Sequence, residues 1–152
     1  MKRSFDSLST AAAKELLTAV LAEGNRFRFT VHGVSMCPFI REGDSVELDA
    51  VGTVRVGDIL LAEKNGRLLL HRAIKVKKDA VLLKGDNLNT ADGWFLKEEI
   101  LAVAVAVTHK GMPQKWGLER FSRTAAVLSR NNLLRKTAVF GSKFLKKVKK
   151  NY

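Results

Sequence analysis

The sequence predicts a mostly β protein built on a coiled, antiparallel sheet. Short segments of alternating apolar and polar residues follow one another from residue 27 to residue 109, with no helices between them. Such closely spaced strands favour antiparallel pairing, because parallel strands need long crossover connections. Asn65-Gly66 lies between two of these segments and suits a tight type I′ hairpin turn. We count about six strands.

Residues 1–25 predict an N-terminal helix. Apolar side chains recur at helical spacing over residues 8–23, and Gly24 stands where a helix often ends. Lys14 and Glu15 interrupt any apolar stretch that a secretory signal would need. We therefore expect a helix that stays with the folded protein.

Residues 26–110 form the predicted sheet domain. Phe27, Phe29 and Val31 alternate with polar residues, as in a half-buried strand. The later strands are "SVELD", "GDILLAE", "RLLLHRAIKV", "AVLLK" and "EEILAVAVAV". In the last of these, large apolar residues face one side and mostly alanines the other, which indicates close packing on the alanine side.

Residues 111–152 form a basic tail. Residues 110–152 carry 12 Lys and Arg against Glu119 alone, whereas residues 1–109 hold 15 Lys and Arg against 14 Asp and Glu. We place the boundary at Gly111-Met112-Pro113, where the composition shifts and a proline interrupts regular structure. The tail predicts a helix, a break near Asn131-Asn132, and a second helix with an apolar stripe opposite its lysines.

Three partners fit this tail: an anionic membrane surface, nucleic acid or an acidic protein. A helix docked on the protein's own domain explains the pattern as well as a membrane surface does. Nucleic acid is the weaker alternative, because no groove-reading motif is present. No run approaches the ~20 apolar residues of a membrane span. We therefore expect a cytoplasmic protein without a transmembrane segment, with peripheral attachment to a membrane left open.

The stretch "HGVSMCPFIREGD", residues 32–44, places Ser35 on a tight turn. A serine hydroxyl attacks a carbonyl only with an adjacent general base. His71 lies in "LLLHRAIKV", where a polar ring among leucines must find a partner or face a site. Asp86 and Asp92 follow in "KGDNLNTADGW", and either carboxylate can orient the imidazole.

Three segments then carry a family resemblance. "GVSMCPFIREGD", "LLLHRAIKV" and "LLKGDNLNTAD" resemble, in order and spacing, three boxes of the signal peptidase I superfamily, which includes LexA-type self-cleaving repressors. The match is to the endoplasmic reticulum and archaeal form, and it covers residues 27–109. The resemblance implies the coiled antiparallel β fold of that superfamily and a serine endopeptidase that needs no metal or cofactor.

The resemblance also assigns roles. It implies that Ser35 is the nucleophile, His71 the general base and Asp92 the acidic third member, with Asp86 as the other acid of its box. Bacterial signal peptidases and LexA-type repressors have a lysine before the arginine of the second box, whereas His71 precedes Arg72 here. The implied substrate is an extended peptide or preprotein with small residues before the cut.

Two features depart from that family. The family's enzymes usually carry an N-terminal membrane span, which we do not predict here. Gly33 stands where many of them have a serine that helps to bind the oxyanion. An alternative function is therefore a non-catalytic or self-cleaving regulatory module, whose basic tail contacts a membrane or nucleic acid.

The neighbouring residues have simpler explanations. We expect Asp44 and Asp58 to serve their turns through Gly-Asp pairs, and Met36 to pack beneath the site. We expect the two remaining histidines, His32 and His109, to be ordinary residues at strand ends. Cys37 offers a second nucleophile beside Ser35, and we favour the serine.

Overall fold

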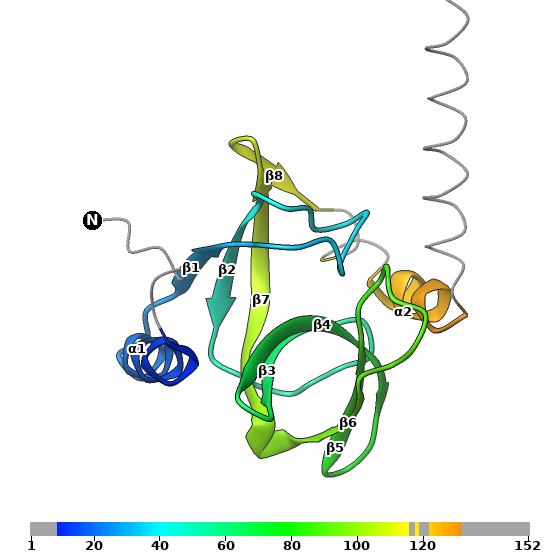
Figure 1. Cartoon of the computed structure of the whole chain (residues 1–152), viewed down its shortest axis with the longest axis horizontal. Coiled ribbons are helices and arrows are strands. Elements are labelled where there is room, and N and C mark those ends of the chain that lie inside the picture. Colours follow the sequence, from blue (N-terminus) through cyan, green and yellow to red (C-terminus); the bar gives the residue numbers. More distant parts are fainter. Residues whose placement is uncertain (1–8, 116–117, 119–121, 132–152) are drawn as a thin grey trace, which may run out of the picture.

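The computed structural model describes residues 9–115, 118 and 122–131 (Figure 1). It confirms the predicted fold class, because one antiparallel sheet of eight strands curls into a half-barrel with a helix at each end of the described chain. The prediction of about six strands is wrong. It missed β6 (Gly93–Leu96) and β8 (Met112–Gln114).

The sheet joins strands that are far apart in the chain. Its order is β1-β2-β7-β3-β4-β5-β6, and β8 pairs with β7. The remaining elements, in chain order, are α1 (Thr10–Ala22), β1 (Phe27–Thr30), β2 (Ser45–Asp49), β3 (Ile59–Lys64), β4 (Arg67–Val76), β5 (Ala80–Lys84), a short 3₁₀ turn (Lys97–Glu99), β7 (Ile100–His109) and α2 (Ser122–Arg130).

The β3–β4 hairpin has the predicted two-residue turn. Lys64 pairs with Arg67, and Asn65 and Gly66 between them have φ angles of 52° and 72°. Asparagine and glycine tolerate this left-handed conformation better than other residues, which is why this pair closes the hairpin.

Strand β7 lies at the centre of the sheet, between β2 and β3. Ala102 and Ala104 are buried on one side, as the alternation of large and small residues predicted, while Leu101 and Val103 are partly exposed on the other. Small side chains allow the curled sheet to close tightly over its core on that side.

Two clusters of buried side chains form the core. One lies beneath α1 and the loop that carries Ser35, and includes Leu17, Met36 and Ile40. The other fills the curl of β3–β6 around Phe95 and Leu83. The site described below therefore sits on a loop whose own apolar residues are part of the core.

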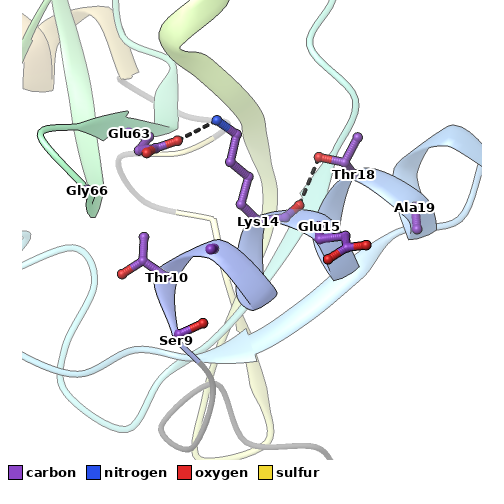
Figure 2. Close-up of a pocket in the computed structure, with 9 residues that line it drawn as sticks. Ser9, Thr10, Lys14, Glu15, Thr18, Ala19, Glu63 and Gly66 are labelled. Atoms are coloured by element: carbon purple, nitrogen blue, oxygen red, sulfur yellow. Dashed lines mark hydrogen bonds and ion pairs between the residues drawn. The ribbon is translucent and has the colours of Figure 1, made fainter.

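Helix α1 agrees with the predicted helix to within two residues. Ser9 caps it by accepting a hydrogen bond from the backbone N–H of Ala12. An ion pair of 2.5 Å between Lys14 and Glu63 ties the helix to the β3–β4 hairpin (Figure 2).

An open cavity of about 880 Å³ lies between α1 and the turn of the β3–β4 hairpin. It is lined by residues of these two elements and does not include Ser35, His71 or Asp92.

The predicted boundary at residue 111 falls in the β7–β8 turn. The proline that we expected to interrupt regular structure, Pro113, instead lies in β8 opposite Thr108. A proline is tolerated there because β8, among the described strands, pairs with β7 alone. Helix α2 follows and ends at Arg130, one residue before the predicted break. The second tail helix and its apolar stripe lie outside the described residues.

Helix α2 docks on the sheet domain. Ala125, Ala126 and Ser129 are buried, whereas Arg123 and Val127 on the same helix are exposed. The two helices lie at opposite sides of the curled sheet (Figure 1). In the described part of the chain, no helix is long and apolar enough to cross a membrane.

Candidate active site

Ser35 begins a tight turn in the loop between β1 and β2. Backbone hydrogen bonds close the base of that loop, from Val31 N–H to Asp44 O at 2.8 Å and from Gly43 N–H to Val31 O at 2.9 Å. Met36 is 3% exposed and packs in the core beneath the turn, as predicted. Ser35 itself is half-buried. The packing of Met36 in the core holds the turn, and with it the Ser35 side chain, in place.

His71 joins the hydroxyl to a carboxylate. Its Nε2 lies 3.0 Å from Ser35 Oγ and its Nδ1 lies 2.7 Å from Asp92 Oδ2. A carboxylate only accepts hydrogen bonds, so Nδ1–H donates to Asp92 and Nε2 is free to accept from the serine hydroxyl. The side chain of His71 is only 9% exposed, and its place on β4 fixes the ring.

Asp92 comes from the loop between β5 and β6, and this loop also holds the serine turn. The Asp92 N–H donates to Leu83 O at 2.9 Å. Asn87 donates from its backbone N–H to Ser35 O at 2.7 Å and from its side chain to Val34 O at 3.1 Å. One loop therefore sets the positions of both the hydroxyl and the carboxylate.

Gly85 permits this close contact between the two loops. A Cβ atom at this position would lie 2.9 Å from Ser35 O and 2.9 Å from Leu88 side-chain atoms. Real Cβ contacts are almost never so short, so a larger residue would push the loops apart.

We expect Gly85→Ala to lower the peptide cleavage that the resemblance implies about 10- to 100-fold, because misplacing reacting groups by roughly 1 Å has an effect of this size. The free energy of unfolding should also fall, by about 1–3 kcal/mol, because the added methyl group overpacks the contact between the loops. Steady-state kinetics and urea denaturation measure both quantities. Gly52→Ala is the matched control, because a Cβ there meets open space. Equal kinetics for the two variants would contradict the clamping role of the loop.

Asp86 lies close to this site but binds a different partner. Its carboxylate accepts from Arg72 Nε at 2.8 Å and from Arg72 Nη2 at 2.7 Å, and both side chains are fully buried. Arg72 also donates to Gly57 O at 2.9 Å. Of the two predicted acids, the structure therefore brings Asp92 to His71 and Asp86 to the next residue, Arg72.

The sequence reasoning missed a second histidine–carboxylate pair. Asp44 accepts from the backbone N–H of Arg41, as a turn residue does, but it also contacts His109 Nδ1 at 2.5 Å. This pair fixes the end of the serine loop to the end of β7. Asp58 serves its turn as expected, by accepting from Arg55 N–H at 2.7 Å.

Two other reactive side chains have different environments. Burial raises the pKa of the Cys37 thiol; Arg41 opposes this shift and Asp44 adds to it. This keeps the thiol protonated and poorly nucleophilic. Lys84 is buried and donates to the carbonyl of Ser129, not to Ser35. No group of three or more His, Cys, Asp or Glu suited to a metal ion occurs among the described residues.

A pocket of about 360 Å³ opens beside Ser35 and His71. Residues 29–33 line one wall and residues 68–70 of β4 line the other, with Met36 and Leu61 beneath. The strand on the first side, β1, is the end strand of the sheet in the described part of the chain and pairs with β2. The pocket is therefore a mostly apolar groove bordered by the end strand of the sheet.

A hydroxyl, an imidazole and a carboxylate in hydrogen-bonded sequence, at the end of an apolar groove, are the arrangement that serine peptidases use. A family model described as Peptidase S24-like matches residues 6–107, which include all three side chains. The chain belongs to this family. A search of curated proteins found no match.

Proposed function

We propose that the protein is a serine endopeptidase of the signal peptidase type, acting through Ser35, His71 and Asp92. The observation that carries this proposal is the pair of contacts that His71 makes, 3.0 Å to Ser35 Oγ and 2.7 Å to Asp92 Oδ2. Membership of the Peptidase S24-like family supports a peptidase or self-cleaving activity.

The proposed reaction has two halves. Ser35 Oγ attacks the peptide carbonyl carbon while His71 Nε2 takes the hydroxyl proton, and Asp92 stabilises the resulting imidazolium. The C–N bond then breaks, the leaving amine takes the proton from Nε2, and an acyl group remains on Ser35. Water hydrolyses this ester by the same proton path, which restores the serine and releases the new carboxylate.

The substrate would bind as an extended strand. The peptide would lie in the groove between β1 and β4, which would receive its alternate side chains. The Ser35 N–H is available as one donor to the oxyanion. Gly33 has a φ of +100°, so a hydroxyl-bearing residue would be strained there. The second donor in this chain would therefore be another group.

We assign the finer type, Ser-His as in endoplasmic reticulum and archaeal signal peptidases, from the residue that precedes Arg72. That residue is His71, and its ring reaches the serine hydroxyl. Lys84, the buried lysine near the site, donates to Ser129 O and not to the Ser35 hydroxyl. This supports an imidazole base over a lysine base.

A fluorophosphonate probe tests the proposal directly. We expect the full-length protein to gain one adduct, which peptide mass spectrometry locates on Ser35, because only an activated serine reacts at an appreciable rate. His71→Ala should abolish labelling. Labelling of another residue, or equal labelling of His71→Ala, would contradict the assignment. Cleavage of the chain itself during incubation would point to the self-cleaving form of the activity.

We also propose that the basic tail binds an anionic membrane surface, which would bring the enzyme to membrane-bound substrates. Replacing Lys146, Lys149 and Lys150 by glutamine should weaken binding to phosphatidylserine vesicles about 100-fold, since each basic residue contributes about 1 kcal/mol. Vesicle sedimentation at low salt measures this. The matched control replaces three exposed lysines of the sheet domain, Lys75, Lys78 and Lys97. Equal loss in both variants would refute a specific role of the tail.

A further inference from the structure

Asn87 binds two consecutive carbonyl groups of the serine turn. Its backbone N–H donates to Ser35 O at 2.7 Å, and its side-chain Nδ2 donates to Val34 O at 3.1 Å. The backbone bond is enough to join the two loops. The side-chain bond adds a hold on one particular peptide unit, the unit between Val34 and Ser35, which also carries the Ser35 N–H.

The geometry of this peptide unit links the side chain of Asn87 to the direction of the Ser35 N–H. The bond between Val34 and Ser35 is trans. In a planar trans unit the C=O and the N–H point in opposite directions. Because Asn87 binds the C=O, the Ser35 N–H points away from Asn87. Gly33 and Ser35 line the groove whereas Asn87 does not, so the N–H is directed to the side from which a peptide would approach.

The Ser35 N–H is free to bind an oxyanion. It has no hydrogen-bond partner among the described residues, although Ser35 is half-buried. Backbone donors that are shielded from water are nearly always paired, so a free one at a site is notable. Hydrogen bonds that share a polar unit also polarise one another, so the bond at Val34 O makes this N–H a stronger donor.

Asn87 is itself held in a fixed turn. The Leu88 N–H donates to Gly85 O at 3.0 Å, which closes a turn with Asp86 and Asn87 at its centre. The Asp86 carboxylate is fully buried and accepts from Arg72 Nη2 at 2.7 Å. The turn cannot rotate without breaking this buried ion pair. The position of Asn87 is therefore set before any substrate binds.

We propose that Asn87 is a positioning residue, which orients the Ser35 N–H toward the oxyanion that forms when the peptide carbonyl is attacked. This inference rests on the proposed peptidase function and adds a residue outside the Ser35, His71 and Asp92 set. Donors that are oriented in advance stabilise the transition state without reorganising. Gly33 supplies no hydroxyl, so the alignment of this backbone donor matters more here.

Asn87→Ala in the full-length protein tests this role. The variant keeps the backbone bond to Ser35 O and loses the side-chain bond to Val34 O. We expect kcat to fall about 10- to 100-fold at unchanged KM, because the donor acts on the transition state and loss of a whole donor lowers the rate about 10²–10³-fold. Thr90→Ala, at an exposed residue of the same loop, is the matched control and should retain the wild-type kcat.

A peptide aldehyde separates orientation of the donor from stability of the fold. Ser35 Oγ adds to the aldehyde carbon, His71 takes the hydroxyl proton, and the aldehyde oxygen becomes an oxyanion. The inhibition constant should rise in Asn87→Ala by the same factor by which kcat falls. A purely structural role would lower the melting temperature and the fraction of protein that a fluorophosphonate labels at its end point. Unchanged kcat per labelled site would therefore overturn the inference.

NMR of the Ser35 amide tests the geometry without any activity. Loss of the bond to Val34 O should shift the Ser35 amide resonance in Asn87→Ala and leave it unchanged in Thr90→Ala. An unchanged resonance in folded Asn87→Ala would also overturn the inference. If the wild-type protein neither cleaves peptides nor reacts with the fluorophosphonate, the peptidase proposal fails, while the amide resonance still decides whether Asn87 orients this peptide unit.

Asn87→Asp covers the case in which Asn87→Ala does not fold. Aspartate keeps the shape of the side chain and the backbone N–H, but its carboxylate cannot donate to Val34 O. We expect the same shift of the Ser35 amide resonance and a lower kcat, measured at pH values where the wild-type rate is constant. A wild-type kcat in Asn87→Asp would show that the side-chain bond does not orient the donor.

Discussion

Ser35→Ala is expected to lower kcat/KM for peptide cleavage by at least about 10⁴-fold, because members of a catalytic triad lose function together. The fold should persist, since Ser35 is half-buried and the turn is anchored by the buried Met36. Rates from a fluorogenic peptide library and circular dichroism of the same samples measure the two properties.

Cys37→Ala is the control for Ser35→Ala. The thiol lies two residues away on the same loop, and burial raises its pKa. This variant should retain wild-type cleavage. Loss of activity in Cys37→Ala together with residual activity in Ser35→Ala would show that the nucleophile is the Cys37 thiol and not the Ser35 hydroxyl.

Asp86→Asn should mainly lower the stability of the fold, whereas Asp92→Asn should mainly lower the activity. Asp86→Asn leaves the fully buried Arg72 without its counter-charge, and breaking such a pair costs about 3–5 kcal/mol of unfolding free energy. Asp92→Asn should change stability by less than about 1 kcal/mol, because its side chain is 21% exposed. It should lower kcat about 10⁴-fold, since an amide no longer selects the required tautomer of His71.

Urea denaturation and cleavage kinetics on both variants separate these effects. Asparagine has nearly the shape of aspartate, so each variant serves as the other's control for volume. If Asp86→Asn cuts activity 10⁴-fold at unchanged stability, the acid that serves His71 is Asp86 and the contact at 2.7 Å with Asp92 is not functional.

The hairpin and the main strands were predictable because their signals are local. Asn65-Gly66 specifies its own turn, and the alternating residues of β7 identify its buried side. Strand β6 was missed because "GWFL" is short and follows a loop rich in polar residues. Strand β8 was missed because its proline was interpreted as a boundary, although an edge strand accepts it.

The candidate site was predictable to a similar degree. The three sequence boxes predicted Ser35, His71 and Asp92 as site residues, and the structure brings these side chains together. Their chemical roles stay a prediction. The sequence could not assign partners to buried charges, because those depend on packing between distant segments. The contact of Lys84 with Ser129 joins residues 45 positions apart, and that of His109 with Asp44 joins residues 65 apart.

The pairing of β2 with β7 also has a consequence for synthesis on the ribosome. Ser45 pairs with Thr108, so the early strand finds its partner only after the chain has been made through residue 108. Such long-range pairing forms late, because the cost in chain entropy precedes the gain from contacts. Until β7 emerges, the loop bearing Ser35 has no completed sheet to hold it. If Ser35 is the nucleophile as proposed, competence for cleavage arises only after the chain has been synthesised through β7.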